Sequence, residues 1–356
     1  MAETLPEEEV FIKLREFLDR LPGGYPETDS GVELKILKKL FSPQEAVMAM
    51  QLTLEPEPAS VIVGRCNMHE DEASDLLESM ARKGLIWRFK EGDEIVYQAA
   101  QFVIGIYELQ VKEMDREFAE MLEEYFPFVA MAMASVDTMQ LRTVPVSTAV
   151  EATHTVATYD QVRELVKQQE LISAAPCVCR KERRILGDDC GHTLENCMGF
   201  GRYAQHYIEY GYGKEISREE ALRILDQAEE EALVLTVSNA QDIDFVCSCC
   251  GCCCGALRII NLLPNPADLV VTSFQAEIDP ELCTACGECV DRCQLNAIVE
   301  GEEFMQVDKA RCIGCGLCVT ACPEDAASLQ LKPEVEVPPL DWDETLARIL
   351  EERGLA

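Results

Sequence analysis

The chain has few basic residues for its acidic content. Its 356 residues include 31 lysines and arginines against 65 aspartates and glutamates, so the formal net charge is −34. A charge of this size repels nucleic acid and anionic membrane surfaces at long range, and it suits a partner with a basic docking patch. We therefore expect a protein partner and no nucleic acid.

Long apolar runs and nucleotide-binding motifs are also missing. The longest apolar stretch, around residues 126–136, is too short to span a bilayer. We find no phosphate loop, dinucleotide fingerprint or nucleophile triad, so no nicotinamide or flavin site can be assigned. The N-terminus carries Glu7, Glu8 and Glu9 where a signal peptide needs basic residues. These absences predict a cytoplasmic protein with no membrane span.

Cysteine is nearly absent from the first half of the chain and dense in the second. Cys66 stands alone and is expected to be a packing thiol, whereas the other 18 of the 19 cysteines lie between Cys177 and Cys322. A secreted protein would use so many cysteines for disulfides. The dense C-x-C and C-x2-C spacings instead indicate metal ligation in a reducing compartment.

The most informative motif is a cysteine run that occurs twice near the C-terminus. Residues 283–293 and 312–322 both follow the spacing C-x2-C-x2-C-x3-C, which holds [4Fe–4S] clusters. Three thiolates wrap one face of a cubane and the fourth cysteine reaches the other cluster. Two zinc sites are the alternative, which the full eight-cysteine pattern disfavours. The predicted ligand sets are Cys283, Cys286, Cys289 and Cys322 for one cluster, and Cys312, Cys315, Cys318 and Cys293 for the other.

Residues 276–330 resemble the bacterial-type two-cluster ferredoxin domain. The likeness extends beyond the cysteines, because Ile278-Asp279 recurs as Val307-Asp308 at an offset of 29 residues. Residues 296–298 and 325–327 correspond in the same way. Gln294 departs from the family, which usually has proline after the fourth cysteine. The resemblance implies two [4Fe–4S] clusters that move single electrons.

The N-terminal region resembles a winged helix-turn-helix domain in its element order. Helices are expected at 32–40, after the N-cap Ser42, and at about 70–82, followed by a β-hairpin over 85–99. The candidate recognition helix carries five acids between residues 70 and 78 before its first base, Arg82. Because lysine and arginine supply most DNA affinity, we expect a docking or dimerisation module.

The central region holds ten cysteines that packing does not explain. We expect one or two further iron–sulfur clusters there; a zinc site of four thiolates, or of three thiolates and His192, is one alternative, and a reactive dithiol is another. The first four cysteines suffice for one centre or share one with the later run. In an extended segment Cys250, Cys252 and Cys254 would face one way, opposite Cys253. The candidate ligands are Cys177, Cys179, Cys190, Cys197, Cys247, Cys249, Cys250, Cys252, Cys253 and Cys254.

Two further groups of residues stand out. Arg180, Lys181, Arg183 and Arg184 form the one dense basic patch, which either docks an acidic partner, tunes a nearby cluster or is a solvated face. The histidines at positions 154 and 206 have no visible partners in the sequence. We expect surface or satisfied residues there and no catalysts.

Together these patterns predict an α+β multidomain protein. We expect an iron–sulfur electron-transfer protein or subunit of a cytoplasmic anaerobic oxidoreductase system, bound to a redox partner and capable of forming homo-oligomers. The alternatives are an iron–sulfur sensor that regulates transcription and a redox enzyme with a substrate-binding cysteine site. The expected units are an N-terminal helix (1–30), a winged-helix-like domain (31–100), linking helices (101–144), a cysteine-rich domain (145–272), a ferredoxin-like two-cluster domain (273–332) and a tail helix (333–356).

Overall fold

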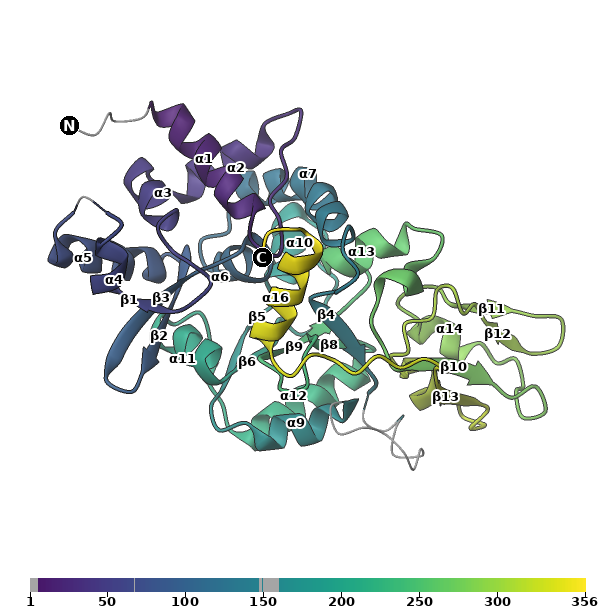
Figure 1. Cartoon of the computed structure of the whole chain (residues 1–356). Coiled ribbons are helices and arrows are strands. Elements are labelled where there is room, and N and C mark those ends of the chain that lie inside the picture. Colours follow the sequence, from purple (N-terminus) through teal and green to yellow (C-terminus); the bar gives the residue numbers. More distant parts are fainter. Residues whose placement is uncertain (1–5, 67, 147–148, 150–159) are drawn as a thin grey trace.

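The computed structural model describes residues 6–66, 68–146, 149 and 160–356. It is a mixed α/β structure in which an N-terminal helical region and a central sheet lie side by side, with a ferredoxin-like region at one end (Figure 1). Within this described part, none of the helices has both the length and the apolar character needed to cross a bilayer. The expectation for His154 lies outside the described residues.

The N-terminal region contains five helices and a small sheet. Ser42 starts α3 because it forms a capping box with Glu45, as its sequence suggested. The expected helices and hairpin are present, while α4 and β1 were not anticipated. Winged-helix identity itself remains a prediction. The elements are α1 (Glu7–Asp19), α2 (Val32–Leu40), α3 (Pro43–Ala49), α4 (Ala59–Val63), α5 (Glu70–Arg82), β1 (Glu57–Pro58), β2 (Ile86–Glu91) and β3 (Glu94–Ala99), with sheet order β1-β3-β2.

The β2–β3 hairpin packs against helix α11 (Gly201–Glu209) of the central region. Trp87 meets the ring of Tyr203 edge-on at 4.9 Å, and the Arg202 guanidinium lies 5.1 Å from the centre of the Phe89 ring. The end of α5 is also engaged, because the Tyr210 hydroxyl donates to Glu78 at 2.9 Å. The hairpin and α5 are thus used for contacts within the chain.

A linking segment connects the hairpin to the central sheet. It contains η1 (Phe102–Ile106), α6 (Tyr107–Leu109) and α7 (Arg116–Met133), and it ends in strand β4 (Leu141–Val144). Asp115 caps α7 by accepting a hydrogen bond from the Phe118 amide at 2.8 Å. The apolar face of α7 is buried against the N-terminal helices, so the expected linking helices are part of a core.

The central region is built on a six-stranded antiparallel sheet of order β4-β8-β9-β6-β5-β7. Along β9, Val246 faces a core shared with α9 and α12, while Phe245, Cys247 and Cys249 face the other way because side chains alternate. The remaining elements are β5 (Ile172–Pro176), β6 (Glu195–Phe200), β7 (Lys214–Glu215), β8 (Val234–Ser238), β9 (Phe245–Cys249), α9 (Val162–Gln168), α10 (Val178–Leu186), α12 (Arg218–Glu230) and α13 (Gly255–Asn261).

The ferredoxin-like region repeats its backbone as well as its sequence. Ala285 and Gly314 adopt left-handed φ values of 55° and 67°, and Asn296 and Asp325 adopt 53° and 52°. Each pair is separated by the repeat offset seen in the sequence. The outer pair β10–β13 and the inner pair β11–β12 are antiparallel. The elements are η3 (Pro266–Leu269), β10 (Phe274–Ile278), α14 (Glu288–Arg292), β11 (Ile298–Glu300), β12 (Met305–Val307), α15 (Leu317–Thr320) and β13 (Ala327–Leu331).

The tail runs back across the molecule and ends in helix α16 (Trp342–Glu352) beside the N-terminal region (Figure 1). Trp342 meets the Phe245 ring edge-on at 5.7 Å. Arg353 donates to the backbone carbonyl of Asp19 at 2.7 Å, at the end of α1. The tail helix thus packs on the chain itself.

Candidate metal centres

The eight cysteines of the ferredoxin-like region form two groups. One small cavity is lined by Cys293 together with Cys312, Cys315 and Cys318. In the other group, burial raises the pKa of the Cys289 thiol, and the nearby Cys322, Cys283 and Cys286 raise that pKa further. Each group therefore combines three cysteines of one run with the fourth cysteine of the other, while the crossed ligation of two clusters stays a prediction.

Backbone amides point at the sulfurs of this region in a repeated pattern. The amide of Ala297 donates to Cys293 Sγ at 3.1 Å, and that of Ala326 donates to Cys322 Sγ at 3.2 Å. The amide of Ala276 donates to Cys312 Sγ at 3.3 Å. Hydrogen bonds to cluster sulfurs help set the reduction potential. These hydrogen bonds stabilise the more negatively charged reduced cluster. They therefore offset part of the effect of the chain's acidic charge on the reduction potential.

Gln294, the residue that departs from the family pattern, joins the ferredoxin-like region to the central cysteines. Its Oε1 accepts a hydrogen bond from the Gly251 amide at 2.7 Å, and its Nε2 donates to the carbonyl of Ala232 at 2.8 Å. Arg292 adds hydrogen bonds to two carbonyls at the end of α12. Proline could make neither side-chain contact, so glutamine here has a docking role that the sequence did not reveal.

Four of the central cysteines form a compact group, which we call the four-thiol site: Cys190, Cys250, Cys252 and Cys253. Their Sγ atoms all lie within 4.8 Å of one another, and Cys252 and Cys253 are 3.8 Å apart. Four thiolates bound to one tetrahedral ion at 2.3 Å would be about 3.8 Å apart. The group fits a single ion as it stands, and it would have to spread to enclose an iron–sulfur core.

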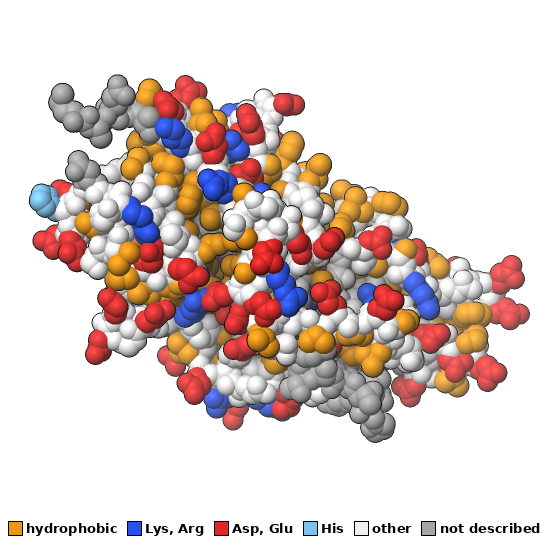
Figure 2. All heavy atoms as spheres, in the orientation of Figure 1, with side chains coloured by type: hydrophobic (Ala, Val, Ile, Leu, Met, Phe, Trp, Pro, Cys, Tyr) orange, Lys and Arg blue, Asp and Glu red, His pale blue; other side chains and the backbone are white. Residues whose placement is uncertain are grey.

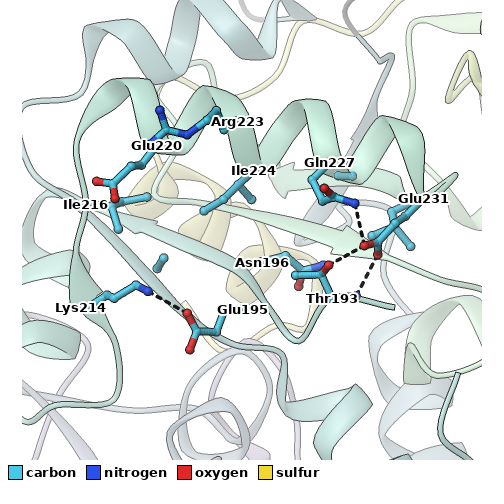
Figure 3. Close-up of a pocket in the computed structure, with 13 residues that line it drawn as sticks. Thr193, Glu195, Asn196, Lys214, Ile216, Glu220, Arg223, Ile224, Gln227 and Glu231 are labelled. Atoms are coloured by element: carbon cyan, nitrogen blue, oxygen red, sulfur yellow. Dashed lines mark hydrogen bonds and ion pairs between the residues drawn. The ribbon is translucent and has the colours of Figure 1, made fainter. Parts of the chain in front are cut away.

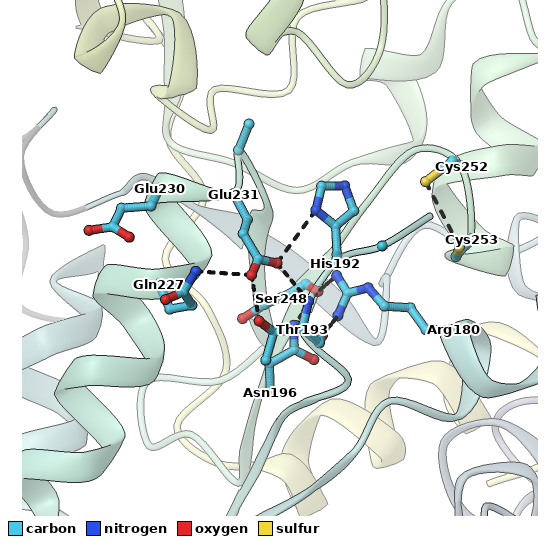
Figure 4. Close-up of polar contacts among 12 residues, drawn as sticks. Arg180, His192, Thr193, Asn196, Gln227, Glu230, Glu231, Ser248, Cys252 and Cys253 are labelled. Atoms are coloured by element: carbon cyan, nitrogen blue, oxygen red, sulfur yellow. Dashed lines mark hydrogen bonds and ion pairs between the residues drawn. The ribbon is translucent and has the colours of Figure 1, made fainter. Parts of the chain in front are cut away.

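His192 does not join the four-thiol site. Its Nδ1 lies 3.4 Å from Glu231 Oε2, and Figure 4 shows the ring directed at that carboxylate. The alternative of three thiolates and this imidazole therefore has no counterpart in the described geometry.

One pocket is lined by Cys250, which also belongs to the four-thiol site, and by the other six central cysteines. We call these six the pocket cysteines: Cys177, Cys179, Cys197, Cys247, Cys249 and Cys254. Their thiols interact as hydrogen-bond partners in an unbroken series, from Cys177 through Cys179, Cys254, Cys249 and Cys247 to Cys197. The pocket has a volume of about 140 Å³. Its other walls come from the linking segment, α11 and the tail, including Tyr107, Tyr207 and Trp342.

These two groups correct the expectations for the central run. Residues 251–253 form a turn, so the extended arrangement with Cys250, Cys252 and Cys254 on one side is wrong. Cys254 faces the pocket, whereas Cys253 joins the four-thiol site. The four earlier cysteines are not brought together either, because Cys190 alone joins the compact group. The sequence indicated that the cysteines of residues 247–254 could supply ligands to two centres, but it did not show which cysteine belongs to which centre.

Arg180 lies buried between the two groups, with 3% of its surface exposed. It donates to the carbonyls of Thr193 at 2.9 Å and Ser248 at 2.7 Å, and its Nε has no hydrogen-bond partner. Hydrogen bonding from the Cys253 thiol lowers the pKa of Cys250 to about 4, and the Arg180 charge lowers it further. The thiolate form that binds metal is thus favoured at this position.

The rest of the basic patch is neutralised by other contacts. Arg183 pairs with Glu123 at 2.9 Å, and Arg184 pairs with Asp189 at 2.9 Å. Lys181 donates to the backbone carbonyl of Val111. The expectation that the patch tunes a nearby cluster can therefore apply to Arg180, which lies beside the thiols, but not to the other three residues. His206, in contrast, is a core residue: burial lowers its pKa to about 3, its Nδ1 faces the Arg88 amide at 3.3 Å, and its buried Nε2 has no hydrogen-bond partner among the described residues.

Two other hollows lie near these sites. An apolar cavity of about 240 Å³ adjoins the pocket and shares Phe126, Leu141, Cys249 and Cys254 with it. The other hollow, of about 240 Å³, lies beside α12 and carries charged groups that pair with one another, such as Lys214 with Glu195 at 2.8 Å (Figure 3). Thiols line the first of these two hollows and not the second, so the candidate metal ligands lie on the pocket side of the sheet.

Comparison with known proteins identifies one part of the chain. Residues 276–329 match the family model of the 4Fe-4S dicluster domain. No curated protein and no solved structure matches the chain. The matched segment and the grouped cysteines together establish that this is an iron–sulfur protein with multiple iron–sulfur clusters, and that its C-terminal region is a ferredoxin-like domain.

Proposed function

We propose that the chain is an electron-transfer protein or subunit of a cytoplasmic anaerobic oxidoreductase system, in which the ferredoxin clusters pass electrons between a partner and the central cysteine centres. The contact between Gln294 and Gly251 carries this proposal. Gln294 directly follows Cys293, a predicted cluster ligand, and Gly251 lies between Cys250 and Cys252 of the four-thiol site. A single hydrogen bond thus separates loops that hold different centres.

The positions of the two clusters indicate which of them exchanges electrons with a partner. The cluster assigned to Cys293 and the second run lies at the central region, because Gln294 and Arg292 dock there. The other cluster has an exposed ligand, Cys286, and exposed apolar neighbours, Leu282 and Val290. An exposed cluster edge suits exchange with a partner. We propose that electrons enter or leave the chain at Cys286.

The surface around Cys286 indicates the kind of partner. The exposed acids Glu281, Glu288 and Asp291 surround Leu282 and Val290. Acidic side chains also spread over the face seen in Figure 2 and outnumber basic ones there. Opposite charge at a docking site mainly speeds the encounter and makes it sensitive to salt. We therefore propose a redox partner with a basic patch around its own electron-transfer site.

Electron delivery to a basic redox protein tests the proposal. With cytochrome c as the acceptor, Glu288→Lys should slow oxidation of the dithionite-reduced chain several-fold at low salt, and the difference should shrink as salt screens the charges. Glu302→Lys, in the loop between β11 and β12, makes the same charge change elsewhere and should have little effect. Equal rates for all three proteins at low salt would refute docking at Cys286.

A redox enzyme is the second candidate, and the apolar cavity beside the pocket cysteines favours it. An apolar cavity of this kind accepts small uncharged molecules. If the central centre acts on such a substrate, carbon monoxide should change the electron paramagnetic resonance (EPR) spectrum of the reduced protein. Filling the cavity with Ala130→Phe should weaken that change. A spectrum that carbon monoxide leaves unaltered would count against the enzyme candidate.

A further inference from the structure

We propose that the six pocket cysteines hold a polynuclear iron–sulfur centre of their own, separate from the four-thiol site and from both ferredoxin clusters. The inference goes beyond the electron-transfer role, which can stand without it. It rests on the way the six thiols converge, on their separation from Cys190, Cys252 and Cys253, and on the buried positive charge beside them.

The six thiols come from separate elements that the fold brings to one place. Cys247 and Cys249 lie two residues apart on β9, so their side chains share one face of the strand. Cys197 lies on the neighbouring strand β6, where the register continues from the Met198–Val246 pair. Cys177 and Cys254 precede α10 and α13. All the cysteines of the chain are free thiols, so no disulfide accounts for this convergence.

Neighbouring residues divide between the pocket and the four-thiol site. Cys254 lines the pocket while Cys253 joins the compact group, and the two sites meet at Cys250, which belongs to that group and also lines the pocket beside Cys249. One short turn therefore supplies ligands to two places. Because the pocket thiols contact one another in series and do not all meet at one point, they fit a core of several metal ions better than a single ion.

The number of thiols points to the same conclusion. A tetrahedral ion takes four ligands, and a cubane cluster also takes four. Six thiolates around one pocket exceed both. The turn between Cys249 and Cys254 of the pocket also contacts the ferredoxin-like domain, through Gly251 and Gln294, so iron–sulfur chemistry fits the pocket better than zinc.

A buried cation provides independent support. Arg180 has no carboxylate among its hydrogen-bond partners, and a buried guanidinium is costly unless anions surround it. Cys177 and Cys249 of the pocket and Cys250 of the four-thiol site are the anionic groups that face it. Two negatively charged metal–thiolate centres on either side of Arg180 would compensate its buried positive charge.

Iron and sulfide analysis of the full-length anaerobic protein tests the proposal. Cys247→Ala should lose about four iron atoms or more per chain, with matching sulfide, and should retain about eight in the ferredoxin clusters. Cys66→Ala makes the same change at a thiol far from the other cysteines in the sequence, and it should lose none; among the described residues this thiol is hydrogen-bonded to the Ile62 carbonyl and to Met48. Cys190→Ala should remove the metal of the four-thiol site and leave the pocket iron in place.

Two controls keep the outcomes distinct. Cys197→Ser retains a polar side chain of similar size and should reproduce the iron loss of Cys247→Ala if that loss reflects ligation and not misfolding. The EPR signals of the ferredoxin clusters should persist in both variants. An unaltered protein with about eight iron atoms, or variants that lose no iron, would overturn the pocket centre, whereas missing ferredoxin signals in the unaltered protein would overturn the electron-transfer role.

Discussion

Replacing Gln294 with alanine should loosen the contact between the ferredoxin-like domain and the central cysteines. The change removes a 2.7 Å hydrogen bond to Gly251 and a 2.8 Å bond to Ala232, both partly buried. At about 1 kcal/mol each, the loss is about 2 kcal/mol, or about thirtyfold in an equilibrium between docked and open loops. Arg292 and Arg311 keep their own hydrogen bonds across this contact, so the domain should remain folded.

Hydrogen exchange measures this effect directly. Peptides that cover residues 249–254 should exchange markedly faster in Gln294→Ala, and electron transfer from the ferredoxin clusters to the central centres should slow. Gln330→Ala removes a glutamine of the same domain whose side chain donates to Ser328 Oγ at 3.2 Å. It should leave both measurements unchanged. If Gln294→Ala exchanges no faster than the control, the hydrogen bonds across the contact do not stabilise it and the proposed path loses its support.

Two further predictions concern single residues. Cys293→Ala should abolish the cluster of the second run, because Cys293 lines that cavity, and the cluster beside it in sequence should survive; the reverse pattern in EPR would contradict crossed ligation. His206 has its pKa lowered to about 3 by burial, so folding favours the neutral ring. The stability it contributes is complete above about pH 6.5 and falls by about 1.4 kcal/mol per pH unit as pH decreases toward 3. His206→Gln should therefore flatten the fall in melting temperature between pH 7 and 5.5, whereas the exposed-site control His69→Gln should not.

The sequence predicted local features of the fold better than contacts between distant segments. Ser42 starts its helix as the expected N-cap, because this signal is contained within four residues. The crossed ligation of the ferredoxin cysteines likewise rests on a fixed spacing, and it stays a prediction. In contrast, the sequence indicated only a weaker turn preference at Gln294. Its docking role could not be predicted, because its hydrogen-bond partners Gly251 and Ala232 lie 43 and 62 residues away.

The central cysteines show a second limit of prediction from sequence. Whether Cys253 and Cys254 face the same centre depends on the turn at residues 251–253, and an extended chain is equally compatible with the spacing alone. Arg180 appeared in the sequence as one of four clustered bases. Its separate role arises because β9 and the loop before β6 supply the carbonyls of Ser248 and Thr193, which hold it between the thiols.

The returning tail has a consequence for the order in which the protein is assembled. Trp342 forms part of the pocket wall, and Arg353, at the end of α16, is hydrogen-bonded to the last residue of α1. The pocket therefore cannot close during synthesis until residues 342–353 have left the ribosome. The iron–sulfur assembly machinery would have access to the pocket cysteines before that moment, and closure of the tail would then shield the completed centre from oxygen and from competing thiols.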